Sequence, residues 1–483
     1  AAQTAVNLSP NYAVAHNNLG TVRQRRGQYS EAEDHFRKAL NLDDDYADAH
    51  ANIAEVLKDT GRIKHALPHY ERARELAPTE AAMGSNHLLA LCALDGISPR
   101  EIAAAHLAWG GTQASAPQVT RSNRRLRVGY VSPDFRRHSV AYFLEPLLEH
   151  HDRGAVEVFA YANMPTVGDS VTQRLRGLAD HWRNVFAWDD RIFVEQVRAD
   201  QIDILLDLAG HTRGNRLTAF AHRPAPVQMS YLGYPATTGL DAMDFRLTDS
   251  WADPPGMTEA FHCEALLRLD GGFLCYRPDD EAPNVAQLPA HRGDGIVFGS
   301  FNNLAKVNKT VIGTWAAILN AVPRSRLILK AKALCDDATV TRITESFALH
   351  GIDPKRIECL SWIVDSSPLA AYNRVDIALD TFPYNGTTTT CEALWMGVPT
   401  VTLAGDWHAA RVGVSLMTKL GLNDWIAPDR NAYVMLAVER ANRLDALAHV
   451  RSGLRNRMAD QGLTDGARFV TNLEAAYREA WNN

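Results

Sequence analysis

From residue 124 onward, short runs of apolar and β-branched residues alternate with stretches in which apolar residues recur every three or four positions. The runs predict strands, and the stretches predict amphipathic helices. Strands are expected at Leu126–Ser132, Val156–Ala162, Ile202–Leu208, Val227–Gly233, Phe245–Thr248, Ile296–Phe301, Arg326–Ala331, Val375–Asp380 and Thr400–Leu403. Strands that alternate with helices favour parallel sheets built from βαβ units. A segment rich in proline and charge, 278–293, divides the series, so we expect two Rossmann-like lobes, 124–277 and 294–483.

The first 115 residues follow another pattern, in which positions 34 residues apart match. Tyr12 matches Tyr46, and Gly27 matches Gly61. This period resembles the tetratricopeptide repeat, whose two-helix units stack to bury their apolar faces. We therefore expect helical repeats over 1–115. They offer either a concave surface for protein partners or a structural cap on the lobes.

Both ends of the repeat region carry information. Residues 5–10 align with residues 39–44, so the sequence begins inside a repeat and we expect earlier repeats to precede it. The polar segment 112–125 predicts a linker to the first lobe. At the other end of the chain, the helical stretch 444–481 is expected to cross back toward the first lobe.

The composition is that of a soluble globular protein, with 46% hydrophobic and 22% charged residues. A net charge of -6 argues against broad binding to nucleic acid or membrane surfaces. No apolar run reaches the length of a membrane span. The six cysteines are scattered without a C-x-x-C pair, which indicates neither a disulfide framework nor a zinc site. We expect a reducing, cytoplasmic compartment.

Candidate chemistry in the first lobe lies in the loops after its strands, because ligands bind beyond the carboxyl ends of parallel strands. His138 follows the first expected strand, and His211 follows the third. Histidine is the usual general base near neutral pH, although most histidines are surface or structural residues. The loop that holds Tyr234 and Pro235 follows the fourth expected strand and should face the same edge.

The most informative segment of the second lobe is 381–397, which follows the expected strand 375–380. Glycine and asparagine make a turn, and threonines including Thr388 and Thr389 should cap a short helix. The unpaired N–H groups and partial positive charge of a helix start suit a pyrophosphate. Glu392 either closes a capping box with Thr389 or accepts hydrogen bonds from ribose hydroxyls.

Lys306 lies in the loop after the first strand of the second lobe. It should face the crevice expected between the two lobes, as should the start of the short helix. A lysine there could neutralise a leaving diphosphate, although a lone loop lysine is usually just solvated. The one D-x-D triplet, Asp43–Asp45, falls in a repeat. We therefore expect catalysis without a metal ion, in which Lys306 and the helix start supply the positive charge.

Taken together, these motifs resemble those of the O-linked N-acetylglucosamine transferases. The resemblance rests on the repeats followed by 128–135, 223–228, 232–235, 301–306 and 379–389, in that order. It implies the GT-B architecture of two Rossmann-like lobes. It also implies an inverting, metal-independent enzyme of the bacterial branch that moves N-acetylglucosamine from UDP-GlcNAc to serine or threonine hydroxyls of proteins, with no cofactor.

By motif position, the resemblance assigns His138 to the active site, and His211 is the second catalytic candidate. It makes Lys306 the diphosphate lysine, with Asn303 as a polar contact beside it. The remaining candidates for contact with the UDP-sugar are Thr388, Thr389, Glu392, Tyr234 and Pro235.

The sequence also departs from the eukaryotic pattern. Thr387 replaces a histidine, Asn303 replaces a glutamine, Glu392 stands where an aspartate binds ribose, and no large domain separates the lobes. Two other functions stay open: a GT-B transferase acting on a small molecule or glycan, and a repeat scaffold that binds nucleotide without turnover. The expected partners are UDP-GlcNAc and, through the repeats, protein or peptide acceptors, with neither nucleic acid nor membrane.

Overall fold

A computed structural model describes residues 1–110, 124–165, 168–361 and 367–482. The chain forms two compact units, each made of three segments. Unit 1 comprises 1–97, 281–405 and 422–455, and unit 2 comprises 98–280, 406–421 and 456–483. The predicted linker at 112–125 lies outside the described residues except for its last two positions. Within the described ranges, no helix is both long enough and apolar enough to cross a membrane.

Unit 2 is built on a seven-stranded parallel sheet with the order β3-β2-β1-β4-β5-β6-β7. The strands are β1 (Leu126–Ser132), β2 (Val156–Ala162), β3 (His181–Asn184), β4 (Ile204–Asp207), β5 (Val227–Ser230), β6 (Phe245–Thr248) and β7 (Ala265–Arg268). The connecting helices are α8 (Ala141–His150), α9 (Ser170–Leu178), α10 (Asp190–Ala199) and α11 (Leu217–Phe220). The strand order reverses between β1 and β4, which is where ligands bind in doubly wound sheets.

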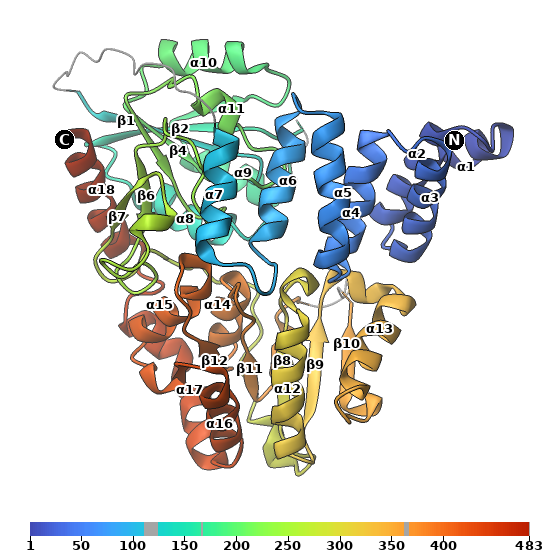
Figure 1. The fold of residues 1–483 in the computed structure, drawn as a ribbon. Coiled ribbons are helices and arrows are strands. Elements are labelled where there is room, and N and C mark those ends of the chain that lie inside the picture. Colours follow the sequence, from blue (N-terminus) through green and yellow to red (C-terminus); the bar gives the residue numbers. More distant parts are fainter. Residues whose placement is uncertain (111–123, 166–167, 362–366, 483) are drawn as a thin grey trace. The chain divides into compact units, whose positions relative to one another are not determined.

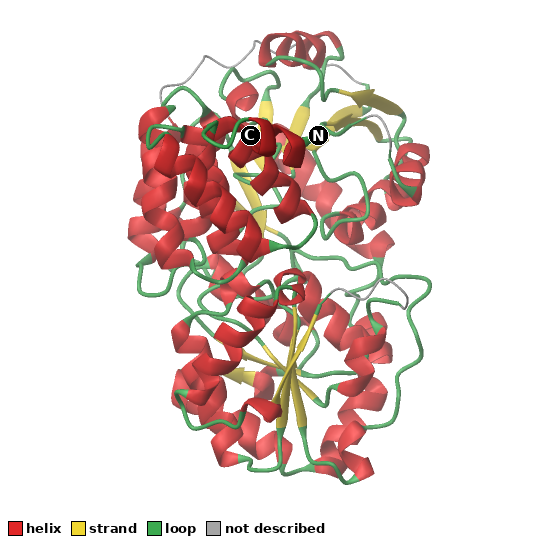
Figure 2. Cartoon of the chain, turned by 90° about the vertical axis from the view of Figure 1, so that its right-hand side faces the viewer, coloured by secondary structure: helices red, strands yellow, loops and turns green. Residues whose placement is uncertain are grey.

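Unit 1 holds a second, six-stranded parallel sheet with the order β10-β9-β8-β11-β12-β13. The strands are β8 (Val297–Ser300), β9 (Arg326–Lys330), β10 (Ile357–Leu360), β11 (Ile377–Leu379), β12 (Thr400–Leu403) and β13 (Ile426–Ala427). Its helices are α12 (Lys309–Ala321), α13 (Asp337–Ala348), α14 (Thr388–Trp395) and α16 (Arg430–Ala441), and helices flank the strands in Figure 2. Here the order reverses between β8 and β11.

All nine expected strands are present, but the sequence did not predict β3, β7, β10 and β13. Each of these four ends its sheet and pairs with a single neighbouring strand. Their side chains are mostly half-buried, whereas β4, β5 and β8 are buried throughout. An edge strand lacks the continuous apolar run that marks a central parallel strand, and the pattern therefore missed these four.

The repeats of unit 1 are helical hairpins, drawn in blue in Figure 1. Helix α1 (Ala2–Leu8) precedes two full hairpins and a single helix: α2 (Ala13–Arg25) with α3 (Tyr29–Leu42), α4 (Ala47–Asp59) with α5 (Ile63–Leu76), and α6 (Ala81–Leu91). The repeated alanines Ala32, Ala39, Ala66 and Ala73 are fully buried, which lets the helices approach closely. The glycines that end α2 and α4, Gly27 and Gly61, adopt positive φ angles of 77° and 80°.

The last helix of the N-terminal region, α7 (Pro99–Gly110), belongs to unit 2 and not to the repeats. Its His106 Nε2 lies 2.7 Å from the hydroxyl of Tyr234, and the ring is fully buried. A Cβ on Gly239 would lie 2.1 Å from the His106 carbonyl oxygen, so only glycine permits this approach. The expected helical region therefore divides between the two units.

Two later segments also join unit 2. Helix α15 (Val412–Lys419) donates a hydrogen bond from Ser415 to the buried Asp249 at 2.5 Å. Helix α17 (Leu444–Asp460) begins in unit 1, and α18 (Gly466–Asn482) packs on α8 in unit 2. Glu474 of α18 lies 3.0 Å from Nδ1 of His151. The C-terminal helix therefore packs on the first lobe, within unit 2.

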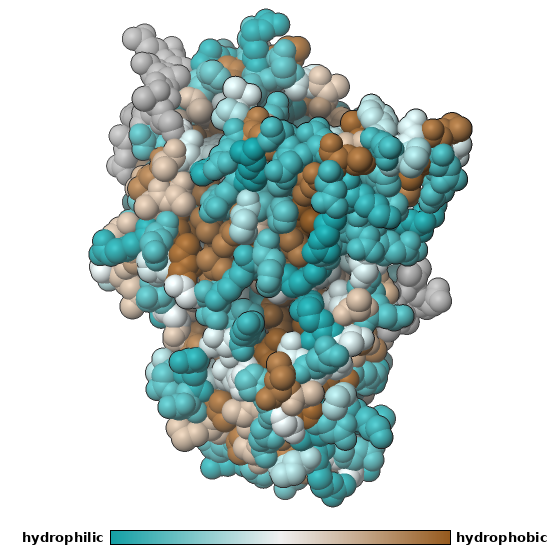
Figure 3. All heavy atoms as spheres, turned by 45° about the vertical axis from the view of Figure 1, so that its right-hand side comes forward, coloured by the Kyte–Doolittle hydropathy of each residue, from teal (hydrophilic) through white to brown (hydrophobic). Residues whose placement is uncertain are grey.

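The face drawn in Figure 3 is mostly hydrophilic, and its hydrophobic residues form small groups. The large hydrophobic residues that are exposed are scattered along the chain, as Leu8, Phe186, Leu349 and Met435 illustrate. Isolated exposed apolar side chains are common on proteins and mark no particular site.

Each full repeat contains a facing pair of histidines. The Nδ1 atoms of His16 and His35 are 3.2 Å apart, and those of His50 and His69 are 2.9 Å apart. The Nε2 of the first ring in each pair lies 2.9 Å from a backbone carbonyl oxygen and must donate to it. When the first ring is neutral, its Nδ1 is the acceptor and the second ring donates to it. Burial and then the neighbouring ring lower the pKa of His35 and of His69.

We expect the repeats to lose stability as the pH falls below about 6.5, because the unfolded histidines bind protons before the folded ones do. Hydrogen exchange of α2–α5, corrected for intrinsic rates and compared at about pH 7.5 and about pH 5.5, measures this loss. A His35→Gln/His69→Gln variant keeps a donor at each position without its charge, so its pH dependence should be weaker. An equal pH dependence in variant and parent would refute this role.

Candidate functional site

The candidate site lies at the carboxyl ends of β8 and β11, the adjacent strands where the order of the second sheet reverses. After β8 the chain passes through Asn302 into a short 3-10 turn, η3 (Leu304–Lys306). After β11 it makes a tight turn and begins α14 at Thr388. Both loops belong to unit 1, so the structure places Lys306 and the start of α14 at one edge of one sheet.

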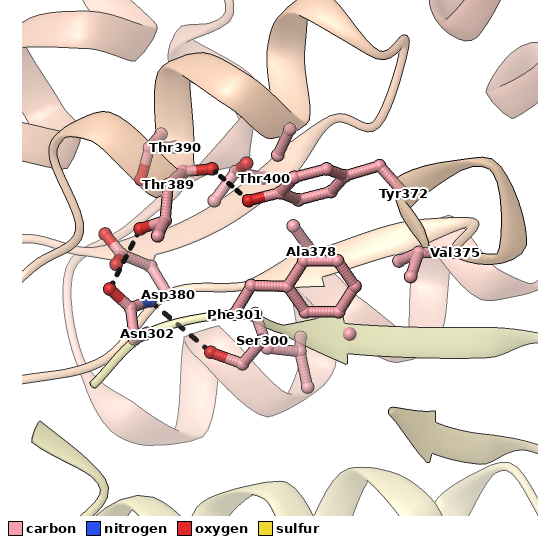
Figure 4. A pocket seen from close by; sticks show the side chains of 13 residues that line it. Ser300, Phe301, Asn302, Tyr372, Val375, Ala378, Asp380, Thr389, Thr390 and Thr400 are labelled. Atoms are coloured by element: carbon pink, nitrogen blue, oxygen red, sulfur yellow. Dashed lines mark hydrogen bonds between the residues drawn. The ribbon is translucent and has the colours of Figure 1, made fainter. Parts of the chain in front are cut away.

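Two hydrogen bonds join these loops directly. The hydroxyl of Thr389 donates to the side-chain oxygen of Asn302 at 3.0 Å, as Figure 4 shows. The ammonium of Lys306 donates to the carbonyl oxygen of Asn385 at 2.7 Å. The lysine therefore lies against the turn that leads into α14. The predicted shared cleft for Lys306 and Thr389 is consistent with these two contacts.

The ammonium of Lys306 belongs to a half-buried side chain, and Asp380 is the carboxylate that acts on its pKa. It lies 3.7 Å from the centre of the Tyr384 ring, a cation–π contact. Desolvation lowers its pKa to about 8, against the opposing attraction of Asp380. A cation held in such surroundings is stabilised by any anion that reaches it.

Asp380 holds the turn between β11 and α14 in shape. Its carboxylate accepts hydrogen bonds from the backbone N–H of Gly386 at 2.7 Å, from that of Thr381 at 2.9 Å and from the hydroxyl of Thr402 at 2.8 Å. Burial raises its pKa to about 6. Its lone pairs are therefore largely committed to the protein, so Asp380 does not give Lys306 a close ion pair.

The start of α14 is more open than the sequence predicted. The expectation that threonine side chains cap this helix is wrong, because in the described structure its N-cap residue, Thr387, makes no side-chain cap hydrogen bond. A Cβ on Gly386 would lie 2.6 Å from the Thr389 hydroxyl and 2.9 Å from the Asn302 oxygen, so a larger residue would displace the hydrogen bond that joins the two loops. An uncapped helix start with a small residue before it presents its N–H groups to an anion.

Glu392 lies one turn into α14, and its carboxylate is held by a neighbouring tyrosine. The Tyr372 hydroxyl donates to its carboxylate at 3.0 Å. Burial lowers the pKa of the nearby Lys330 ammonium, and the charge of Glu392 partly opposes that shift. The capping-box alternative is excluded, because the helix begins at Thr388 and Glu392 is its fifth residue. Its carboxylate therefore remains a candidate acceptor for ligand hydroxyls.

An aromatic pair forms the floor beside Glu392. The rings of Phe301 and Tyr372 have centres 4.3 Å apart, and Figure 4 shows the Tyr372 hydroxyl pointing toward Thr389 at the start of α14. The cavity that they line with Thr389 measures about 20 Å³, which is room for about one water molecule. These rings therefore support the loops, and the cavity that they line is too small for a nucleotide.

His138 lies in unit 2, in the loop after β1 at the reversal point of the first sheet. Its Nδ1 is 3.5 Å from the carboxylate of Asp134, and 38% of its side chain is exposed. Desolvation lowers its pKa, although Asp134 opposes that shift. The imidazole is therefore neutral at pH 7 and able to accept a proton.

The structure gives His211, Tyr234 and Pro235 structural contacts. The His211 ring is fully buried, its Nε2 lies 2.8 Å from the carbonyl oxygen of Thr238, and burial lowers its pKa to about 3. It packs edge-on against Trp109 of α7, with ring centres 4.5 Å apart. Tyr234 bonds to the same helix, and Pro235 is buried beside it. These contacts fasten α7 to the first sheet.

The sequence assigned a polar contact with the ligand to Asn303, but Asn302 is the residue whose side chain reaches α14. The Asn303 side chain is exposed and accepts the backbone N–H of Ala305 at 2.9 Å, so it caps its own turn. Sequence reasoning also missed Asp380 and Tyr372. Asp380 carried a usable signal, because an acidic residue that ends a buried strand needs buried donors.

Within the described ranges, no group of three or more histidine, cysteine, aspartate or glutamate side chains is arranged to hold a metal ion. The positive charge near the start of α14 comes from Lys306 and the helix itself. These groups suit a phosphorylated ligand.

The chain is similar to known proteins over most of its length. Residues 110–275 and 284–473 match the model of glycosyl transferase family 41, and residues 13–46 and 47–80 each match a tetratricopeptide repeat model. The solved structure of a lysine-to-methionine variant of the O-GlcNAc transferase from Thermobaculum terrenum is similar over 99% of this chain and 92% of that one, with 37% identity and a TM-score of 0.94. The predicted fold class, helical repeats followed by two Rossmann-like lobes of the GT-B kind, is confirmed.

Curated relatives give the same family. The chain is 44% identical over 422 residues to the rice protein named "Probable UDP-N-acetylglucosamine--peptide N-acetylglucosaminyltransferase SPINDLY", a match that covers 84% of this chain and 45% of the relative. The Arabidopsis thaliana protein of the same name is 42% identical over 419 residues, with 84% of this chain and 46% of the relative covered. The chain therefore spans less than half the length of these curated relatives.

We expect Lys306 to titrate near pH 8 in the free protein, well below the usual value for lysine, because desolvation of its ammonium lowers its pKa to about 8. The rate at which an amine-selective reagent labels Lys306, followed by peptide mass spectrometry across the pH range, measures this titration. Lys309, exposed three residues later, is the internal control in the same experiment. Equal midpoints for the two lysines would contradict the proposed desolvation.

Proposed function

This chain belongs to glycosyl transferase family 41, and on that basis we propose that it transfers N-acetylglucosamine from UDP-GlcNAc to serine and threonine hydroxyls of proteins. The names of the curated relatives and of the similar solved structure support this donor and this class of acceptor. The observation that carries the proposal is the pairing of Lys306 with the uncapped start of α14 at one edge of the second sheet.

In this proposal, the UDP diphosphate lies between the Lys306 ammonium and the first N–H groups of α14. A charged donor and a helix start each attract an anion, and both attractions are stronger where water is excluded. During transfer the bond between the anomeric carbon and the diphosphate oxygen breaks, and that oxygen keeps the electron pair. Lys306 and the N–H groups of Thr388 and Thr389 stabilise the charge that develops there.

We assign the ribose to the face that carries Glu392. Its carboxylate stands one helical turn from the proposed diphosphate contacts, and the Tyr372 hydroxyl fixes its direction. Carboxylates at this place in dinucleotide sites accept hydrogen bonds from ribose hydroxyls. Asn303 lies in the turn before Lys306 and is proposed as a polar contact at the rim of the same site.

His138 is proposed to act on the acceptor side. An acceptor hydroxyl oxygen attacks the anomeric carbon opposite to UDP, which inverts the configuration, and its proton passes to a base or to water. The lowered pKa of His138 keeps its ring neutral and so able to take that proton or to orient the donor. His211, Tyr234 and Pro235 support α7 from within unit 2, so we propose a structural role for them.

The direct test is to incubate the protein with a set of UDP- and GDP-sugars and candidate acceptor proteins. Nucleotide release and labelled protein are measured together. We expect release of UDP from UDP-GlcNAc that depends on acceptor, with one N-acetylhexosamine added to a serine or threonine. Sugar transfer to a small molecule or glycan, preference for another donor, or UDP binding without turnover would each contradict the proposal.

Lys306→Ala should reduce both UDP affinity and transfer, with transfer falling by about 10²- to 10³-fold, the usual cost of losing one preorganised charge-stabilising group. Titration calorimetry with UDP and initial rates of transfer measure the two effects. Lys309→Ala removes an exposed lysine of the same loop region and should leave both values near those of the parent. Comparable losses in the two variants would remove the specific role of Lys306.

His138→Ala should separate the two measurements. Transfer should fall by about 10²-fold or more, the usual contribution of a general base, while UDP affinity stays close to that of the parent because unit 1 supplies the diphosphate contacts. His150→Ala, which removes an exposed histidine at the end of α8, is the matched control. A His138→Ala enzyme with the parent's transfer rate would exclude His138 from the chemistry.

A further inference from the structure

The turns between the paired helices of the repeats contact the carboxyl edge of the second sheet, and all of these residues belong to unit 1. Cys335, in the loop after β9, donates from its thiol to the carbonyl oxygen of Gly27 at 3.3 Å. Gly61 approaches Leu304 in the loop after β8. Asp95 accepts a hydrogen bond from Thr310 at the start of α12. The two repeat turns and the turn after α6 therefore contact the segments that follow β8 and β9.

The contact of Gly61 is the one that reaches the site. With a φ of +80°, a Cβ on Gly61 would lie 2.9 Å from the backbone carbonyl oxygen of Leu304 and 3.6 Å from its Cβ. Leu304 is 1% exposed and begins the η3 turn that carries Lys306 two residues later. The same carbonyl accepts the N–H of Val307 at 2.9 Å, which closes that turn. The Gly61 backbone thus touches the atom around which the lysine turn is built.

Further contacts hold this edge of the repeats in place. Ser30 donates from its backbone N–H and its hydroxyl to Asp336 at 3.0 and 2.9 Å, and Asp336 also caps α13. Arg342 of α13 donates to the carbonyl oxygen of Thr60, the residue before Gly61. The side chain of Thr60 is buried and bonded to its own helix at 2.8 Å. The Thr60–Gly61 turn is therefore held by α13 as well as by its contact with η3.

We propose that the second repeat is a structural part of the donor site, in which Gly61 is a positioning residue that sets the place of Lys306 through the η3 turn. For its activity readout this inference rests on the proposed function. Gly61 acts through the Leu304 carbonyl and makes no contact with the ligand itself. The repeats then do more than present a surface to protein partners, because the lysine turn packs against one of their turns.

The physical reason for sensitivity at this position is that the blocking atom is backbone. A side chain in the way can rotate, whereas the Leu304 carbonyl can yield only if η3 moves and takes Lys306 with it. A misplacement of about 1 Å at a site of charge stabilisation can cost about 10²-fold in rate. A methyl group at residue 61 should therefore push the Leu304 carbonyl, and with it the η3 turn, away from the repeat.

The test compares Gly61→Ala with Gly96→Ala. Both glycines adopt positive φ, +80° and +87°, so an alanine suffers similar backbone strain at each, although Gly61 directly follows the end of α4 and Gly96 lies in the turn after α6. A Cβ at residue 96 meets nothing within 4 Å. We expect Gly61→Ala to lower UDP affinity and transfer by about 10- to 100-fold, and Gly96→Ala to stay within about 2-fold of the parent. Equal losses in both variants would overturn the inference, because strain alone would then explain them.

A double-mutant cycle locates the effect at the lysine. In a Lys306→Ala background, Gly61→Ala should lower UDP affinity by less than about 2-fold further, since the residue through which it acts is gone. A full additional loss in that background would overturn the inference. Where Gly61→Ala does not fold, Arg342→Gln releases the Thr60 carbonyl without a clash, and it should produce a smaller loss of the same kind.

A readout without activity separates this inference from the proposed function. The pH midpoint of Lys306 labelling should rise from about 8 toward the ordinary value in Gly61→Ala, because a displaced ammonium is better hydrated, and should not change in Gly96→Ala. An unchanged midpoint in Gly61→Ala would overturn the inference. If the labelling midpoint shifts in Gly61→Ala as expected, but the parent protein neither binds UDP nor transfers sugar, the proposed function alone is overturned.

Discussion

The desolvated ammonium of Lys306 is the interaction on which the site depends. Its direct partners within the loops are neutral, a carbonyl oxygen and an aromatic ring, and the nearest carboxylate, Asp380, is occupied with shaping the next turn. Placing a positive charge in such surroundings costs free energy that the fold must supply. In the proposed function, an arriving diphosphate offsets that cost and also meets the open start of α14. On that proposal the lobe is preorganised for charge that arrives with the ligand and grows as the leaving group departs.

This arrangement needs rigid supports, because a cation that could move into water would lose its advantage. Phe301 and Tyr372 pack beneath the loops, and Gly386 leaves room for the hydrogen bond between Thr389 and Asn302. The repeats add a third support at Leu304 from a part of the chain more than 200 residues away. Tetratricopeptide repeats are usually described as surfaces for partners. In this chain their inter-helix turns also form part of the framework around the lysine.

Much of this could be predicted from the sequence, because the central strands of a parallel sheet are continuous apolar runs and their carboxyl ends meet at one edge. That reasoning brings Lys306 and Thr389 together before any coordinates are seen. It does not give the strand order that makes β8 and β11 neighbours, nor the half-buried edge strands. It also could not choose between Asn302 and Asn303, since the direction of each side chain depends on the turn that follows. His211, the second candidate, follows an expected strand as His138 does, but α7 covers it with Trp109, a contact across about 100 positions.

The central claim is that one diphosphate is held by both the Lys306 ammonium and the N–H groups that open α14. A crystal structure of the protein with UDP tests it most directly. The account predicts oxygens of the same diphosphate within hydrogen-bond distance, about 2.7–3.2 Å, of Lys306 Nζ and of the backbone nitrogen of Thr388 or Thr389. A diphosphate bound away from either group would contradict it.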